Sequence, residues 1–277
     1  TRNIENVKER LITILVAPFM TCAARLPVYT IIIALVIPAK KFMGIDYRAI
    51  ALLGMYLLGF VTALVSALIL KKTIKQKTKS FLIMELPPYK KPLFGYDFKL
   101  MLGKVWEFIN GAGRVILAVS IILWFLSYLG PKQNPDQYVA TDVHLHDSYL
   151  AKMGKAIEPV VAPLGYDWKM GVSIISSFAA REVFVGTMAT LYSLDDDVEE
   201  GPIVDKMRND VKPNGEKVFT LATGLSVLVY YAFAMQCVST IAVVYRETRS
   251  IKWTTLQLVG MTGLAYLAAF LVYQFFR

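Results

Sequence analysis

Charge-free apolar runs, each long enough to cross a bilayer, recur along this chain. Residues 50–70 hold no charged side chain in 21 positions, residues 218–245 in 28 and residues 253–276 in 24. About 20 apolar residues at ~1.5 Å each cross the hydrocarbon core, so each run predicts a spanning helix. A shorter run at 115–131 needs its flanks to reach that length. The pattern predicts an all-α fold, a polytopic transmembrane helical bundle.

The stretch APFMTCAARLPVYT interrupts the first apolar region with two prolines and an arginine. Pro18 and Pro27 each remove an amide donor and clash with the preceding turn, so residues 17–28 are expected to be unwound or kinked. Unwinding frees carbonyl oxygens, which can coordinate a cation. A charge at membrane depth costs roughly 2.5–3.5 kcal/mol, so Arg25 indicates either a functional role or a buried brace for those carbonyls.

A second interrupted segment, FAAREVFVGT at 178–187, repeats the Ala-Ala-Arg sequence and carries Arg181 and Glu182. Arg181 lies three predicted crossings after Arg25, so the two segments are expected to run in opposite directions. Two interrupted segments in corresponding places predict an inverted repeat with a binding site at the midplane. Bracing is the structural interpretation of both arginines, with Glu182 neutralising one of them. A carboxylate is also a natural cation ligand.

The distribution of positive charge predicts the topology. Residues 71–114 hold ten Lys and Arg against three acidic residues, which is typical of the cytoplasmic side of a spanning helix. From this loop outward, 170–194 is expected to cross inward, 195–217 to be cytoplasmic, and the C-terminus to lie inside. A re-entrant segment anywhere in the chain would reverse the direction of every later crossing. The chain is expected to divide into five parts. These are a first interrupted segment with a spanning helix (1–70), a basic loop (71–114), a spanning helix with an outside loop and the second interrupted segment (115–194), an acidic loop (195–217) and a C-terminal helix pair (218–277).

Within the basic loop, DFKLMLGKVWEFINGAG repeats apolar residues at three- and four-residue spacing. This period predicts an amphipathic helix over 97–113 that lies on the inner membrane surface. The chain is then expected to turn into the membrane at Gly111–Gly113.

Sulfur-bearing side chains flank the first break and the middle of a later spanning segment. Met20 and Cys22 belong to the first, and Met235, Gln236 and Cys237 to YYAFAMQCVST. Thioether and thiolate groups suit soft and borderline metals such as Fe²⁺ or Cu⁺ rather than Mg²⁺ or Ca²⁺. Met and Cys are also ordinary packing residues, so metal binding and packing both stay open.

Other features narrow the function. His144 and His146 in DVHLHD could share a face and bind metal, but a solvated loop is the simpler interpretation. The net charge of +9 accompanies spanning helices, so it indicates lipid rather than nucleic acid as the partner. The sequence contains no GxxxxGK[ST], HExxH or GxSxG motif, so this chain is not expected to be an enzyme.

Five stretches carry a resemblance to a known family. ILVAPFMTCAARLPVYT, MELPPYKKP, GAGRVILAVSIILWFL, APLGYDWKMGVSIISSFAAREVFVGT and YYAFAMQCVSTIAVVYRETRSIKWTTLQLVGMTGLAYLAAFLVYQ resemble, in this order, the C-terminal membrane half of ferrous-iron transport protein B (FeoB). The resemblance covers nearly the whole chain, except that residues 132–147 and 195–217 carry little of it.

The resemblance implies Fe²⁺ as the transported ion and the bacterial inner membrane as the location. It implies an N-terminal GTPase domain outside this chain, which would bind GTP and Mg²⁺, together with small cytoplasmic accessory proteins and a homo-oligomer. It places Cys22 and Cys237 on the iron path. The family often has proline where this chain has Gln236, which weakens the expectation of a helix break there.

The sequence thus predicts a permease core in which Fe²⁺ passes between two broken segments. Cys22, Met20, Glu182 and Cys237 would touch the ion, with Met235 and Gln236 as neighbouring candidates, and Arg25 and Arg181 would brace the unwound backbone. Two alternatives remain: a carrier of an organic anion or nucleoside-like solute, with the arginines as anion ligands, and a membrane receptor or scaffold that transports nothing.

Overall fold

A computed structural model describes residues 4, 6–38, 40–42, 45–73, 93–128, 148–193, 203–211, 215, 217–235 and 237–277. These residues are mostly helical, in agreement with the predicted all-α bundle. The α-helices are α1 (Val7–Val16), α2 (Leu26–Val36), α3 (Tyr47–Thr73), α4 (Phe94–Phe108), α5 (Arg114–Tyr128), α6 (Tyr149–Val161), α7 (Trp168–Ser176), α8 (Val183–Ser193), α9 (Ile203–Asn209), α10 (Leu221–Phe233), α11 (Val238–Thr248) and α12 (Ile251–Phe276). Two-residue strands β1 (Lys41–Phe42) and β2 (Ile45–Asp46) pair antiparallel before α3.

Within the described residues, four segments are long and apolar enough to cross a membrane. Two are continuous helices, α3 and α12. The other two, Lys8–Val36 and Leu221–Thr248, are each broken in the middle, so that α1 and α2 share one crossing and α10 and α11 share the other. The multi-pass helical architecture expected from the apolar runs is confirmed.

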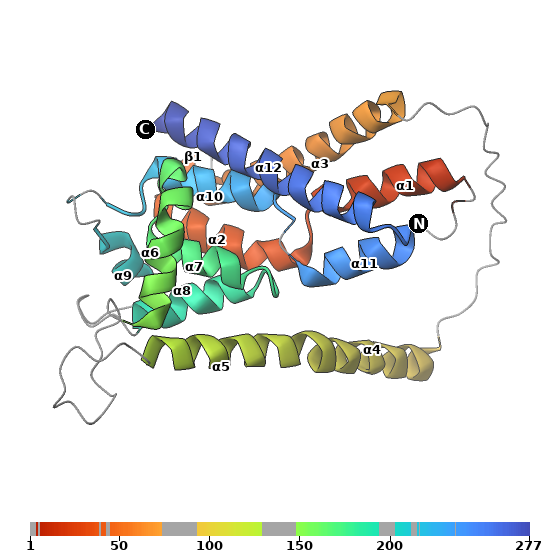
Figure 1. The fold of residues 1–277 in the computed structure, drawn as a ribbon, viewed down its shortest axis with the longest axis horizontal. Helices are drawn as coiled ribbons and strands as arrows, with labels where there is room; N and C mark the ends of the chain where they lie inside the picture. Colours follow the sequence, from red (N-terminus) through yellow and green to blue (C-terminus); the bar gives the residue numbers. More distant parts are fainter. Residues whose placement is uncertain are drawn as a thin grey trace.

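The crossings connect two ends of the bundle, the N-terminal end, where α1 begins, and the C-terminal end, where α12 finishes (Figure 1). At the N-terminal end, the Arg10 guanidinium donates to the Glu247 carbonyl at 3.1 Å and so joins the start of α1 to the last turn of α11. At the C-terminal end, Arg208 of α9 donates to the Ala34 carbonyl near the end of α2 at 3.2 Å. The α1–α2 and α10–α11 crossings therefore run antiparallel.

Helices α7 and α8 form a re-entrant hairpin and do not cross the bundle. Lys169 in the first turn of α7 lies 4.5 Å from the ring centroid of Tyr192 in the last turn of α8, so the hairpin begins and ends at the C-terminal end. At ~1.5 Å per residue, helices of 9 and 11 residues reach only about half of the ~30 Å hydrocarbon core. The predicted crossing at 170–194 is therefore wrong.

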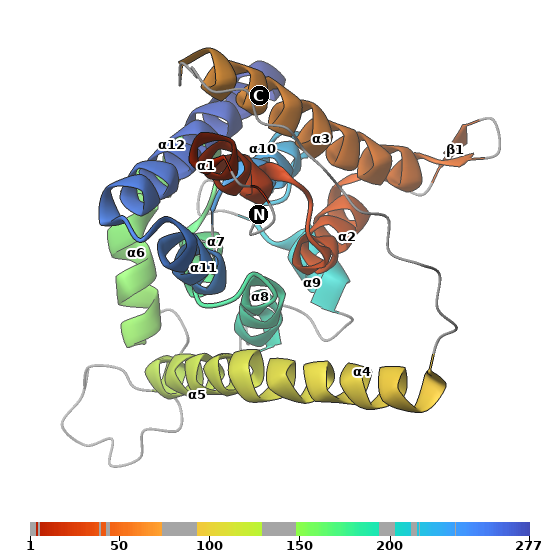
Figure 2. The same cartoon turned by 90° about the vertical axis from the view of Figure 1, so that its right-hand side faces the viewer.

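The hairpin changes the topology of everything that follows it. Helix α9, from the acidic loop, packs at the end of α2, which the prediction placed on the opposite side. The directions of α10–α11 and α12 are also reversed, and the start of α1 and the end of α12 lie at opposite ends of the bundle (Figure 1). Figure 2 shows α8 lying between the core helices and the α4–α5 rod.

Helices α4 and α5 are joined into one straight rod by a π-helical turn, Ile109–Gly113 (η3). The turn into the membrane predicted at Gly111–Gly113 is wrong, because the five-residue π turn absorbs the glycines without changing direction. The rod of residues 94–128 is about 52 Å long at ~1.5 Å per residue, which exceeds the hydrocarbon core.

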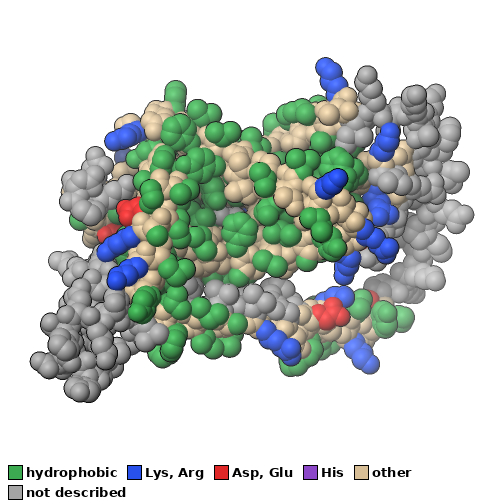
Figure 3. All heavy atoms as spheres, in the orientation of Figure 1, with side chains coloured by type: hydrophobic (Ala, Val, Ile, Leu, Met, Phe, Trp, Pro, Cys, Tyr) green, Lys and Arg blue, Asp and Glu red, His purple; other side chains and the backbone are tan. Residues whose placement is uncertain are grey.

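Small residues allow the closest helix packing. Ala265 and Ala269 of α12 are fully buried, and the Ser226 hydroxyl of α10 donates to the Ala269 carbonyl at 3.0 Å. Gly224 lies on the face of α10 that contacts α2. A Cβ added there would meet the Val36 side chain of α2 at 2.3 Å. Such close contacts are typical of membrane helices, which gain little from burying apolar surface. Large apolar side chains cover much of the visible outer surface, and lysines and arginines lie mainly toward its ends (Figure 3).

Candidate functional site

The first break is built around carbonyl groups that the helix can no longer satisfy. Helix α1 ends at Val16, a 3-10 turn (η1, Ala17–Phe19) follows, and the backbone is extended at Met20 and Cys22. Pro18 explains the change, because it lacks the amide that would continue the α1 ladder. Pro27 instead lies in the first turn of α2, where proline is well tolerated, so it helps to start a helix rather than to break one.

Arg25 binds the carbonyls that this break sets free. It is only 1% exposed; Nη2 donates to the Pro18 carbonyl at 3.0 Å, and Nη1 donates to those of Phe19 and Met20 at 3.3 Å each. A guanidinium has enough donors in one plane to serve several acceptors. This geometry is that of a brace holding the unwound backbone.

Helix α3 has a glycine, Gly59, where the first break packs against it. A Cβ on Gly59 would lie 2.8 Å from the Thr21 hydroxyl oxygen and 3.3 Å from the Phe19 carbonyl oxygen. The same carbonyl accepts a hydrogen bond from Arg25. Glycine at this position therefore lets the braced backbone lie directly against α3.

The hairpin tip carries the second arginine, which binds the neighbouring segment. Arg181 is 5% exposed; Nη2 donates to the Ala234 carbonyl at 2.6 Å and Nη1 to the Tyr231 carbonyl at 3.4 Å. Both carbonyls lie at the C-terminal end of α10. Each broken crossing thus has a buried arginine at the end of its first half-helix. Arg25 belongs to the crossing that it braces, whereas Arg181 comes from the hairpin and braces the α10–α11 crossing.

The third break, between α10 and α11, was only weakly expected, because this chain has Gln236 where the family often has proline. Ala234 and Cys237 are extended, and the Val238 amide donates to the Phe178 carbonyl of the hairpin tip at 3.1 Å. The structure therefore contains two broken crossings and a re-entrant hairpin where the sequence predicted two interrupted segments. No proline marks this break, and its partner is 60 positions away, so local sequence gives little signal for it.

The predicted metal ligands that the structure describes lie at or beside these breaks. Cys22 is exposed, Met20 is 58% exposed, and Cys237 and Glu182 are half-buried, whereas Met235 is fully buried and packs in the core. No cluster of three or more His, Cys, Asp or Glu side chains that could hold a metal occurs in the described part of the chain. Gln236, His144 and His146 lie outside the described residues.

Glu182 was expected to neutralise one of the two arginines, and the described ion pairs do not include such a contact. Among the described ion pairs none involves Arg25, Arg181 or Glu182. Glu182 therefore does not neutralise either guanidinium through a direct ion pair, and its carboxylate has no hydrogen-bonded partner in the described structure. The first break and the hairpin tip interact electrostatically, because Arg25 and Arg181 lie close enough to repel each other.

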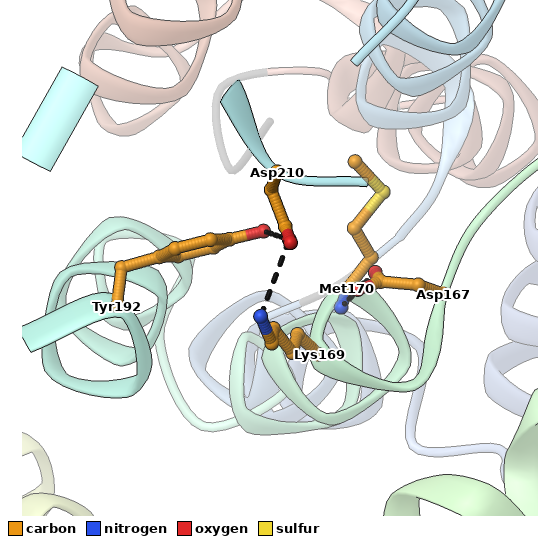
Figure 4. A network of polar contacts seen from close by, with 5 residues as sticks. All are labelled: Asp167, Lys169, Met170, Tyr192 and Asp210. Carbon is orange, nitrogen blue, oxygen red and sulfur yellow. Dashed lines mark hydrogen bonds and ion pairs between the residues drawn. The ribbon is translucent and has the colours of Figure 1, made fainter. Parts of the chain in front are cut away.

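A buried polar network holds the base of the re-entrant hairpin (Figure 4). Asp210, which follows α9, accepts from Lys169 Nζ at 3.2 Å and from the Tyr192 hydroxyl at 2.5 Å. The side chains of Lys169 and Asp210 are 5% and 12% exposed, so both charges are largely removed from water. Asp167 caps α7 by accepting from the Met170 amide at 2.9 Å. One carboxylate therefore joins both arms of the hairpin to the segment that leads into α10.

The fold defines a class of protein. Two antiparallel broken crossings and a re-entrant hairpin place it among multi-pass helical membrane proteins with discontinuous helices, an arrangement that many membrane transporters share.

Comparison with known proteins gives the family. A model described as "Nucleoside recognition" (Gate) matches residues 110–251, and one described as "Ferrous iron transport protein B C terminus" matches residues 52–107. The chain belongs to the FeoB family and corresponds to its C-terminal membrane half. No solved structure matches the chain.

The relatives agree with this assignment along the whole chain. The Fe(2+) transporter FeoB of Leptospira biflexa is 44% identical over 276 residues, which cover 99% of this chain and 40% of the relative. That of Leptospira interrogans is 40% identical over 281 residues, with the same coverage. A Porphyromonas gingivalis relative, named as an Fe(2+) transport protein A/Fe(2+) transporter FeoB fusion protein, is 31% identical over 99% of this chain and 35% of its own length. The chain therefore spans about 40% of the length of the two Leptospira relatives.

Proposed function

We propose that this chain is the permease core of a ferrous-iron transporter and moves Fe²⁺ across the bacterial inner membrane into the cytoplasm. The main support is the contact of the hairpin tip with the third break, through Arg181 and the Phe178 carbonyl. The relatives of this chain are named Fe(2+) transporters, which supports Fe²⁺ as the ion. Breaks of this kind place unpaired backbone and polar groups at membrane depth, where they can replace the hydration of an ion.

In this proposal Fe²⁺ passes the exposed Met20 and Cys22, then Glu182 and Cys237. Sulfur and carboxylate groups on separate elements suit a passing ion, and the described residues contain no cluster of three or more His, Cys, Asp or Glu side chains that would hold it in place. Arg25 and Arg181 brace the backbone and discourage cation leak by their charge. Met235 is assigned to packing because it is fully buried.

The proposal places the energy input outside this chain. We infer from the resemblance to the FeoB family that the full-length protein binds GTP and Mg²⁺ through a domain outside this chain, which spans about 40% of the length of the Leptospira relatives. The fused relative from Porphyromonas gingivalis supports a small accessory protein as a partner. The lipid bilayer surrounds the apolar outer surface, and a homo-oligomer is part of the same proposal.

Uptake of ⁵⁵Fe²⁺ into cells that carry the full-length gene tests this function. We expect gene-dependent uptake that falls at least tenfold in Cys22→Ser and in Glu182→Gln at equal protein abundance. Glu158→Gln, a half-buried carboxylate in α6, is the matched control and should transport like the wild type. Uptake that does not depend on the gene would refute iron transport, and normal uptake in both site variants would refute the path.

A further inference from the structure

The interior holds two positive charges with no negative partner. Arg25 and Arg181 are 1% and 5% exposed, and the described structure pairs neither with a carboxylate. Their acceptors are main-chain carbonyls at the ends of broken helices, which together carry only about half an elementary charge per helix. The pair therefore stays net positive at membrane depth, where an uncompensated charge is costly.

Two donors beside these charges also lack an acceptor. The Nε of Arg25 and the hydroxyl of Tyr29 are buried without a hydrogen-bond partner. Tyr29 is fully buried and lies four residues after Arg25, so both side chains leave the same face of the segment. Tyr29 is near enough to both guanidinium groups to interact with them electrostatically. The orphan donors of Arg25 and Tyr29 therefore belong to side chains that interact with the two unpaired charges.

The chemistry of these groups selects the occupant. A guanidinium N–H can only donate, so the orphan Nε requires an acceptor. A cation is excluded by two positive charges, whereas a water molecule could accept a hydrogen bond but would not offset the charge. We propose that a small monovalent anion, with chloride as the physiological case, binds between Arg25, Tyr29 and Arg181. Its binding depends only on these described groups and not on the proposed iron transport.

An anion at this position would have a role beside the path. By lowering the positive potential between the two braces, it would allow a divalent cation to approach the breaks, and its loss would leave the electrostatic barrier in place. This consequence, unlike the binding itself, rests on the proposed function.

Thermal unfolding of the purified full-length protein in nanodiscs, without iron, tests the site. Chloride or bromide replaces gluconate at constant ionic strength, so that only specific binding shifts the unfolding temperature. We expect a saturable rise with either halide, and a halide affinity at least fivefold weaker in Tyr29→Phe, which loses one donor. Tyr266→Phe is the matched control; it removes the hydrogen bond to the Val160 carbonyl and should keep the full halide response.

Anomalous diffraction from bromide-soaked crystals locates the ion independently of stability. The proposal predicts a peak between the Arg25 and Arg181 side chains. A halide response that is absent, or equal in Tyr29→Phe and wild type, would overturn it, as would density for water alone at that position. Iron uptake is not part of either readout, so failure here and failure of the transport proposal are separable.

Discussion

Arg25 is tied to the local backbone by three hydrogen bonds, and this explains why a charge persists inside an apolar segment. The carbonyls of Pro18, Phe19 and Met20 would otherwise be buried without donors at the point where α1 stops. Each unsatisfied buried carbonyl costs about 1–3 kcal/mol, so the brace offsets much of the penalty for burying the guanidinium.

Replacing this side chain should reveal the brace. We expect Arg25→Met to lose about 3 kcal/mol of stability, because three carbonyls lose their donor, and Arg25→Lys to lose less but remain below wild type, because an ammonium lacks the planar fork. Thermal unfolding in detergent measures both. The exposed Arg246 of α11 provides the control, since Arg246→Met should change little. Equal stability of Arg25→Met and wild type would contradict the bracing role.

At the scale of elements, Gly59 of α3 determines how closely the first break can pack against that helix. A side chain at Gly59 must displace the Thr21 side chain or the Phe19 carbonyl. Gly54 lies on the same helix, and a Cβ there would meet nothing within 4 Å. The same substitution at the two glycines therefore separates the effect of packing at Gly59 from the effect of helix propensity.

Gly59→Val should lower the unfolding temperature and impair iron uptake, because the braced backbone is pushed away from α3. Gly54→Val should be neutral or slightly stabilising, since valine is a better helix former than glycine by a few tenths of a kcal/mol. Fluorescence-detected thermal unfolding of both variants gives the comparison. If the two substitutions had the same effect, the close contact at Gly59 would have no role.

The elements that sequence could predict are those with local signals. Prolines and a charge mark the break at 17–25, and uninterrupted apolar runs mark α3 and α12. Arg181 and Glu182 likewise mark the interruption at the hairpin tip. Its re-entrant form has no local signal, because the two arms are brought together by Lys169, Tyr192 and Asp210, of which the last is 41 positions from the first. Likewise, the break after α10 depends on contacts with the hairpin tip rather than on its own residues.

At the scale of the whole molecule, one hairpin reverses every later crossing. Lys40, before α3, and Asp205, in α9, belong to the same end of the bundle in this arrangement, whereas Lys72 and Lys252 belong to the other. The alternative predicted from charge alone would place residues 40 and 205 on opposite sides of the membrane.

Labelling of single introduced cysteines in intact cells with a membrane-impermeant maleimide distinguishes these arrangements. We expect Lys40→Cys and Asp205→Cys to be labelled together, and Lys72→Cys and Lys252→Cys to react only after permeabilisation, or the reverse. The native Cys22 and Cys237 are replaced by serine in this background. Labelling of positions 40 and 205 from opposite faces would refute the re-entrant hairpin.

Protection of the two cysteine thiols by Fe²⁺ tests whether the ion passes the breaks. Cys22 is exposed and Cys237 half-buried, with no disulfide, so both can be alkylated in the native full-length protein. Alkylation rates are measured peptide by peptide by mass spectrometry, anaerobically, with increasing Fe²⁺ and with Mg²⁺ as the control cation. We expect Fe²⁺ to slow the alkylation of both cysteines saturably, and Mg²⁺ to leave the rates unchanged. Rates that are unaffected by Fe²⁺ at both positions would contradict passage of the ion through the breaks.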